Sequence, residues 1–441
     1  MSGASVVDGS GPPTLAAAQA RIAAVNPAEY ARTRNALDGA VTGLSPYITH
    51  GLVTLSDVLA GVAATHPLTF ADKFVFELGW REYFQHVWQH RGAAIFESLH
   101  EGPLPDAAYS RELPADVREA RTGLPVIDAA VRTLYATGLL HNHARMWLAS
   151  YLVHLRKVHW RTGADWMVAQ LLDGDLASNH LSWQWVAGTG SSKPYLFNAD
   201  NVARFAPVAW HSAGTAIDTS YESLDEIARD HTRVVGAPAQ MRRVRATEKA
   251  TEKATEKVIE KATANATRAQ PAFEPATHHA PPPGLAASAI DAALVRGRDV
   301  WLVHPWALRE PPADLPGDVL CIGLWLDEFH RMWPWREARW TFVGTRMREL
   351  APVCWHGDAA TLAKALSGAR SVASVDDPHL GDTLRTLAVC RPAPHLFAAV
   401  DMPCASFSRW WSRATSGAKT LHDLPGLAEH VIPATSHRFT P

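Results

Sequence analysis

The sequence predicts an all-α domain followed by a Rossmann-like parallel α/β domain. Three observations support this fold class. Apolar residues recur at three- and four-residue spacing up to about residue 210, short apolar runs alternate with helical patterns from residue 299, and a charged repeat separates the two regions. The predicted domains are 14–212 and 298–435, joined by a linker over 213–297.

The helical prediction rests on apolar positions that keep to one face. They do so over 126–134 and over 146–154, and Gly and Pro fall between such runs, as in Gly123-Leu124-Pro125. No alternating strand pattern of any length occurs between residues 14 and 210. We therefore expect a largely all-α domain there.

A short repeat fills the middle of the predicted linker. ATEKATEKATEKVIEK begins at residue 246, and its four-residue period places glutamates on one helical stripe and lysines on the next. A pair such as Lys249 and Glu252 stabilises a helix by only about 0.2–0.5 kcal/mol, and the stretch has no apolar face. We expect a solvated helix or a disordered spacer, closed by HHAPPPG at 278–284.

The C-terminal region alternates between two patterns. Apolar runs predict strands at 299–304, 319–324, 352–355, 371–375 and 395–400, and helical patterns cover 338–350 and 359–366. Strands that alternate with helices indicate βαβ units and a parallel sheet. Because Gly-x-Gly-x-x-Gly is absent, a dinucleotide site of the Rossmann type has no support in the sequence.

Composition limits the function. Of 441 residues, 47% are hydrophobic, which is enough for a sizeable core, and a net charge of −2 argues against a polybasic binder while leaving room for a local basic patch. The four cysteines form no CxxC pair, so we expect free thiols and no metal site. Without a secretory signal or a long apolar stretch, the sequence predicts a cytoplasmic monomer with no membrane span.

Polar and aromatic side chains gather in four segments of the predicted helical domain. The densest runs from Asp173 to Trp185 and holds two carboxylates, an amide and two indoles. A helix that begins near Ala177 places Asn179 and Trp183 on one face. The alternative is a polar helix start with core tryptophans, and the segment alone does not decide between the two.

The other segments leave similar alternatives. A buried Arg145 needs an anionic partner, which the 173–175 turn can supply, whereas a surface helix needs none. Glu77 and Trp80 share a helix face, and they form either a core acid beside an indole or a site that recognises an aromatic base. The Gly- and hydroxyl-rich turn at 39–45 suits a phosphate group.

Taken in order, the four segments resemble the flavin-binding domain of the photolyase/cryptochrome family over roughly residues 14–210. The runs DGDLASNxxxWQW at 173–185 and TGxPxxDAAxRxLxxTGxxHNxxRM at 122–146 are highly specific. The signatures YxxxR at 30–34 and LSPY at 44–47 are weaker but correctly placed. The resemblance implies an FAD cofactor held by an α-helical domain.

The resemblance also implies which residues hold the flavin. Arg145 and Asp173 correspond to an ion pair across the ring system, and Asn179 to the residue that faces flavin N5. Asparagine at this position favours stabilising a reduced flavin. The full implied cofactor set is Tyr30, Arg34, Thr42, Ser45, Asn142, Arg145, Asp173, Asp175 and Asn179.

A DNA-lesion pocket is the next implication of the resemblance. Trp80 and Trp185 would flank a thymine dimer that is flipped out of the duplex, and Glu77 would hydrogen-bond its base edge. Together with Asn179, these residues form the implied catalytic set. The implied DNA contacts are Glu77, Trp80, Arg81, Asn142, Met146, Trp185 and Lys193.

The implied activity is that of a deoxyribodipyrimidine photolyase: light-driven electron transfer from reduced FAD splits a cyclobutane pyrimidine dimer in UV-damaged DNA. Asn142 and Met146 match the cyclobutane-dimer subgroup. The alternative is a cryptochrome-like blue-light photoreceptor without repair activity. Three features favour that alternative. Basic residues are lost, because His143 replaces a usual arginine and the segment 193–198 is short and lacks one; the linker is charged; and a third tryptophan for electron transfer is missing.

Two further implications concern electron transfer and domain order. Trp183 and Trp160 fit the first two members of the family's tryptophan relay, but the stretch 104–121 contains no tryptophan, so Tyr109 is the candidate third member. The C-terminal domain resembles the family's antenna domain, which normally comes first. The sequence therefore predicts a circularly permuted order, and it leaves the antenna chromophore open.

Overall fold

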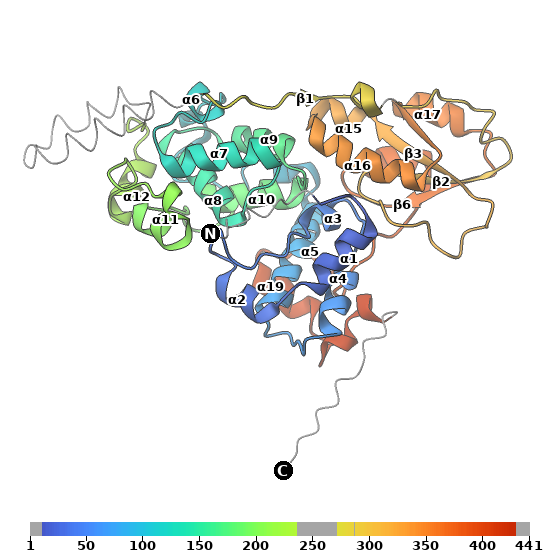
Figure 1. Cartoon of the computed structure of the whole chain (residues 1–441), viewed down its shortest axis with the longest axis horizontal. Coiled ribbons are helices and arrows are strands. Elements are labelled where there is room, and N and C mark those ends of the chain that lie inside the picture. Colours follow the sequence, from blue (N-terminus) through green and yellow to red (C-terminus); the bar gives the residue numbers. More distant parts are fainter. Residues whose placement is uncertain (1–10, 236–270, 286, 429–441) are drawn as a thin grey trace, which may run out of the picture.

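The structure is a computed structural model that describes residues 11–235, 271–285 and 287–428. The ATEK repeat at 246–261 lies outside the described residues. Within them, helices fill the N-terminal half and a parallel sheet lies in the C-terminal part (Figure 1). The predicted combination of a helical region and a parallel α/β region is confirmed, and the predicted domain boundaries stay predictions.

The N-terminal part is helical, as predicted. Its helices are α1 (Leu15–Ala23), α2 (Pro27–Thr33), α3 (Ser45–Thr49), α4 (Leu55–Ala63), α5 (Lys73–Arg91), η1 (Gly92–Phe96), η2 (Asp106–Ala108), α6 (Ala115–Arg118), α7 (Pro125–Thr137), α8 (Asn142–Ser150), the π-helical η3 (Tyr151–Leu155), α9 (Trp160–Gln170), α10 (Leu176–Ala187), α11 (Ala199–Phe205), η4 (Val208–Trp210) and α12 (Tyr221–Arg229). Helix α12 lies in the predicted linker, and its Leu224 and Ala228 are fully buried.

Local sequence sets where the site-bearing helices begin and end. Asp175 caps α10, because its carboxylate accepts a hydrogen bond from the Ser178 N–H at 2.7 Å. Pro125 begins α7, where a missing N–H costs nothing. Gly138 ends α7 with φ at 71°, a left-handed conformation that glycine adopts without strain.

The C-terminal part holds a five-stranded parallel sheet with the order β5-β3-β2-β6-β7. Its strands are β2 (Asp299–Val303), β3 (Leu320–Leu326), β5 (Val353–Gly357), β6 (Ser371–Val375) and β7 (Val389–Arg391), with helices α15 (Asp327–Met332), α16 (Glu337–Leu350), α17 (Ala359–Leu366) and α18 (Gly381–Leu387). Strand β3 is buried along almost its whole length, as expected for a parallel strand covered on both faces. A separate antiparallel pair joins β1 (Thr277–His278) to β4 (Trp335–Arg336).

One strand prediction is wrong. Residues 395–400 form no strand, and the sheet ends instead with Val389–Arg391. The backbone N–H groups of Leu396 and Phe397 donate to the carboxylate of Glu82 on α5. Both side chains are buried, so the apolar run that suggested a strand serves packing against the helical part.

The C-terminal segment 396–427 packs on the N-terminal helices. Helix α19 (Phe407–Ala414) lies against α5, where Phe407 stacks on Trp80 with ring centroids 4.1 Å apart. Figure 1 shows this segment, in red, among the blue helices α1, α2 and α4. The remaining short helices are η6 (Pro283–Leu285), η7 (Leu421–Asp423) and η8 (Pro425–Leu427). The helical part is therefore assembled from both ends of the chain.

Two apolar cores meet at α10. One core joins the N-terminal helices to the sheet and includes Phe74 and Trp301; the other includes buried residues of α7, α8, α9 and α10. Leu181 of α10 belongs to the first core and Trp183 to the second. The motif at 173–185 thus lies where the two cores adjoin, held by packing on both sides.

Candidate functional site

The site centres on an ion pair between α8 and the turn before α10. Arg145 Nη2 donates to both carboxylate oxygens of Asp173, at 2.9 and 2.8 Å, and the Asp173 side chain is only 3% exposed. Burial opposes ionisation of Asp173, but Arg145, the Ser45 hydroxyl and Arg81 outweigh it and lower its pKa. The pair is present, and its position across a flavin stays a prediction.

Helix α5 supplies a second guanidinium to the same place. Arg81 Nη2 donates to the Ser45 hydroxyl at 2.6 Å. Burial lowers the pKa of Arg81, and the negative charges of Asp173 and Asp175 oppose that shift. We call Ser45, Arg81, Arg145, Asp173 and Asp175 the central polar cluster.

Gln85, one turn after Arg81 on α5, extends the central polar cluster. Its side-chain amide donates to Asp175 Oδ2 at 2.9 Å. Its own carbonyl oxygen is shielded from solvent and accepts no hydrogen bond from the residues that the structure describes. A buried acceptor without a partner is uncommon in folded proteins and calls for a donor. The i,i+4 spacing from Arg81 is the sequence signal by which Gln85 was predictable.

Tyr30, Arg34 and Glu77 lie beside the central polar cluster. Burial, followed by the charge of Glu77, raises the pKa of Tyr30 to about 12, so its hydroxyl stays a hydrogen-bond donor. Arg34 Nε lies 3.5 Å from Glu77 Oε1, and Lys73 Nζ lies 2.9 Å from the same oxygen. The Thr42 hydroxyl accepts from the backbone ahead of α3.

The two predicted asparagines occupy different environments. Asn179 on α10 is 7% exposed, and its amide donates to the Ala164 carbonyl at 3.0 Å. Asn142 begins α8 on an exposed turn, where its amide approaches the sulfur of Met146 at 3.6 Å. Asn179 therefore points its amide into packed helix, whereas Asn142 is open to solvent.

The residues of this site fit FAD. The guanidinium groups of Arg81 and Arg145 are charged donors for acceptor atoms of the cofactor, and the hydroxyls of Tyr30 and Ser45 add neutral donors for the phosphates and the ribityl chain. The carboxylates and the unpartnered Gln85 oxygen accept from N–H or hydroxyl groups, which the ring and the ribityl chain of a flavin carry. These donors and acceptors come from four separate helices and the 173–175 turn.

The predicted lesion residues are spread over a wider surface. Trp80 has one ring face covered by Phe407, with only 11° between the two ring planes. Trp185 is 43% exposed and lies 5.6 Å from the Tyr195 ring. Within the described part of the chain no ring contact joins Trp80 to Trp185, so a two-sided pocket stays a prediction. Phe407 gave no signal in the sequence, because it lies in the other predicted domain.

The predicted DNA contacts also differ in position. Lys193 is exposed. Arg81 is partly buried and donates to Ser45 within the central polar cluster, so its guanidinium is engaged there and its contact with DNA stays a prediction. His143 is 9% exposed and its ring bonds the Asn35 carbonyl at 2.8 Å, so it contributes to packing.

Of the predicted relay residues, Trp183 and Trp160 are buried and Tyr109 is half-buried. Trp183 is 3% exposed and packs on Gly163, and Trp160 is 2% exposed. Tyr109 contacts His159 edge-on at 6.3 Å, and His159 lies 5.7 Å from Trp160. A second path, absent from the sequence prediction, runs from Trp160 through two further rings of the described structure, His180 and Trp333.

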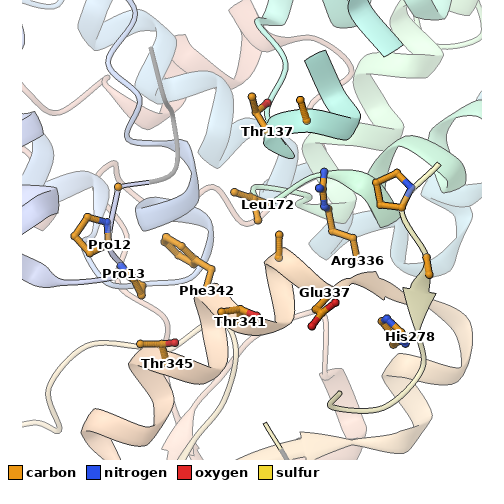
Figure 2. A pocket seen from close by; sticks show the side chains of 15 residues that line it. Pro12, Pro13, Thr137, Leu172, His278, Arg336, Glu337, Thr341, Phe342 and Thr345 are labelled. Atoms are coloured by element: carbon orange, nitrogen blue, oxygen red, sulfur yellow. The ribbon is translucent and has the colours of Figure 1, made fainter. Parts of the chain in front are cut away.

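A cavity of about 650 Å³ lies between the helical part and α16 (Figure 2). Arg336, Glu337 and Phe342 line it from one side, and Thr137 and Leu172 from the other. None of the predicted flavin or lesion residues lines this cavity. It is therefore separate from the central polar cluster.

The described residues provide neither a metal cluster nor a membrane helix. No group of three or more His, Cys, Asp or Glu side chains among them is placed to hold a metal ion. No described helix is long and apolar enough to cross a bilayer. All four cysteines are free, with Cys354 and Cys404 buried and Cys321 and Cys390 partly buried.

Comparison with known proteins identifies the helical part. Residues 74–264 match the model of the FAD-binding domain of DNA photolyase. This segment belongs to the photolyase and cryptochrome family. The match contains both specific motifs and most of the central polar cluster, so the family resemblance of the sequence is confirmed there.

Named relatives belong to both branches of the photolyase and cryptochrome family. A deoxyribodipyrimidine photo-lyase of Synechococcus is 34% identical over 195 residues, which are 40% of this chain and 39% of that protein. A cryptochrome DASH of Idiomarina loihiensis is 33% identical over 170 residues, 37% of this chain and 38% of the relative. The chain thus matches about two fifths of the length of these relatives. A solved Synechocystis cryptochrome covers 43% of the chain at 26% identity, with a TM-score of only 0.39.

Proposed function

We propose that this protein is a deoxyribodipyrimidine photolyase that repairs cyclobutane pyrimidine dimers in UV-damaged DNA. The observation that carries the proposal is the Arg145–Asp173 ion pair beside Arg81, all within the segment that matches the FAD-binding domain of DNA photolyase. A photolyase needs a site that binds FAD rigidly and a neighbouring surface that receives a base. The described residues offer groups for both.

FAD, when bound, supplies the light-excited electron that opens the cyclobutane ring. The central polar cluster holds and orients it: Arg81 and Arg145 carry the positive charge, and the carboxylates of Asp173 and Asp175 accept hydrogen bonds. Asn179 donates its amide N–H to the Ala164 carbonyl, which fixes this side chain one helix turn after Asp175. Packing of α10 between two cores excludes water from that end.

Glu77, Trp80 and Trp185 are proposed to receive the flipped-out dimer. Extruding a damaged base pair costs a few kcal/mol, less than an intact pair, because stacking is already weakened. Trp80 is half-buried and would have to stack on a base through the ring face that Phe407 does not cover, and the exposed Trp185 offers another stacking surface. Glu77 must exchange its contact with Lys73 for one with the base edge.

We further propose that the two domains are circularly permuted relative to the photolyase family. The support is that the C-terminal segment returns to α5, where Glu82 and Trp80 bind it. In family members the α/β domain comes first, so the segment that connects it to the helical domain would have to lie in this position against α5. Here that segment lies at residues 396–427, after the sheet.

The test is light-dependent repair of an oligonucleotide that carries one defined thymine dimer, using purified FAD-loaded protein in reductant with a dark control. We expect repair only in the light. Glu77→Ala should reduce lesion binding with FAD retained, whereas Glu226→Ala, at an exposed glutamate of α12, should leave it unchanged. Absence of repair by protein with bound, reduced FAD would contradict the proposal.

A cryptochrome-like photoreceptor is the second candidate. The stacking of Phe407 on Trp80 and the ion pairs of Glu77 favour it, because both occupy groups that a lesion would need. This function predicts no repair and a light-dependent change in protease sensitivity of the predicted linker. Identical digestion in light and darkness would count against it.

A further inference from the structure

We propose that the α/β domain completes the flavin site, with His379 as the positioning residue that holds Asp175 and the start of α10. The inference rests on the proposed function only in requiring that the chain binds FAD. It assigns to the α/β domain a role in cofactor binding in the helical domain. His379 lies more than 200 residues from Asp175 in sequence, after strand β6.

Both ring nitrogens of His379 have partners. Its Nε2 accepts from the Leu176 backbone N–H at 3.2 Å. Its Nδ1 lies 2.7 Å from Asp377 Oδ1, which accepts the Nδ1 proton. The same Nε2 lies 3.5 Å from Asp175 Oδ2. Asp377 thus orients the imidazole against the 173–175 turn, whose two carboxylates are predicted to bind the flavin.

This contact completes the cap of α10. The first N–H groups of a helix have no partner within the helix. Asp175 Oδ1 accepts from the Ser178 N–H, and His379 Nε2 accepts from the Leu176 N–H. One acceptor for the first turn of α10 therefore comes from the helical domain and the other from the α/β domain. With Ser178 on one oxygen and Gln85 on the other, Asp175 has a single orientation. Moving His379 frees the first turn on which Asp175 depends.

The His379 ring is held by aromatic packing and cannot easily turn away. Trp306 stacks on it with centroids 4.3 Å apart and 11° between planes, and Trp88 of α5 contacts its edge at 4.9 Å. The side chain is 2% exposed. It therefore lies between an indole of each domain.

Two more side chains tie the same turn to the α/β domain. Arg339, 1% exposed, donates to the Gly174 carbonyl at 2.8 Å while its guanidinium lies 4.0 Å from the Trp335 ring centroid. His50 lies between two carbonyls, Leu172 at 2.9 Å and Pro305 at 2.7 Å. The 172–176 turn is thus held across the domain boundary at three points.

The experiment measures the affinity for FAD of the full-length apoprotein by fluorescence titration. We expect His379→Leu to weaken binding about tenfold, the scale of one hydrogen bond in a charged site. His379→Gln, which keeps an acceptor near the Nε2 position, should restore affinity to within about threefold. In an Asp175→Asn background, His379→Leu should add less than twofold, because it acts through Asp175.

His304→Leu is the matched control. His304 is equally buried in the α/β domain and lies near the same Trp306, but its ring bonds the Val375 carbonyl within that domain. Equal loss of affinity in both leucine variants, or wild-type affinity in His379→Leu, would overturn the inference. Wild-type protein that takes up no FAD would overturn both proposals, whereas FAD uptake without repair would overturn only the repair function.

Discussion

Glu82 Oε2 accepts a hydrogen bond from the backbone N–H of Phe397 at 3.1 Å, and this bond ties the C-terminal segment to α5. The Leu396 N–H donates to the other oxygen of the same carboxylate. One turn later, His86 Nε2 accepts from the Cys404 N–H at 3.2 Å. Helix α5 thus carries the central polar cluster on one side and holds the returning chain on the other.

Glu82 predicts a pH-dependent stability. Burial raises its pKa to about 7, against an ordinary value of 4.5, although the two backbone donors oppose the shift. The folded state then holds a proton that the unfolded state loses, so the Glu82 contribution to stability falls as pH rises from about 4.5 to 7 and is constant above. Unfolding of wild type and Glu82→Gln by urea across this range should show that slope only in the wild type.

His86 supplies the control for that comparison. Burial lowers its pKa to about 4, so its contribution is lost as pH falls from 6.5 toward 4, the opposite direction. Wild type and Glu82→Gln share the His86 contribution, so it cancels when their free energies of unfolding are subtracted. If the difference in free energy of unfolding between wild type and Glu82→Gln does not change with pH, the role given to Glu82 is contradicted.

The Arg145–Asp173 pair predicts a strong asymmetry between two variants. Arg145→Leu leaves a carboxylate that is 3% exposed without its main partner and should destabilise the fold by about 3 kcal/mol. Asp173→Asn removes the buried charge itself and should cost less. Urea unfolding of the FAD-free protein measures both free energies. Equal values would mean that Asp173 has other adequate partners.

The sequence predicted those parts of the site that lie within short motifs. Arg145 and Asn142 share one helix turn, and the carboxylates precede α10 by a few residues, so local spacing was sufficient. Leu396 and His379 were out of reach, because their partners lie some 200 to 300 residues away. The strand prediction at 395–400 was wrong because a buried strand and a buried loop can have the same apolar composition, and the partner of this segment, α5, is distant in sequence.

Gly79 predicts a steric limit on docking of the C-terminal segment. A Cβ atom there would lie 2.5 Å from the Trp411 ring, closer than real contacts allow. Gly79→Ala should therefore destabilise the protein by about 1–3 kcal/mol through overpacking. Gly417→Ala, in the same C-terminal segment but with no atom near its Cβ position, should leave thermal unfolding unchanged. Equal behaviour of the two variants would mean that Trp411 moves aside freely.

The relay prediction separates two aromatic paths that leave Trp160. One passes through His159 to Tyr109, and the other through His180 to Trp333. If Tyr109 is the third member, Tyr109→Phe should slow light-driven reduction of the bound flavin, because phenylalanine lacks the oxidisable phenol, and Trp333→Phe should not. The flavin absorbance under blue light, with an external reductant, reports the rate.

Trp160→Phe is the reference variant for this measurement. Since both paths share Trp160, its loss should slow flavin reduction at least as much as either distal change. Burial raises the pKa of Tyr109 to about 12, so its phenol is neutral throughout the physiological range and must lose a proton when it is oxidised. The Tyr109 path should consequently show a solvent deuterium effect. A slow rate confined to Trp333→Phe, without that isotope effect, would assign the third position to the α/β domain instead.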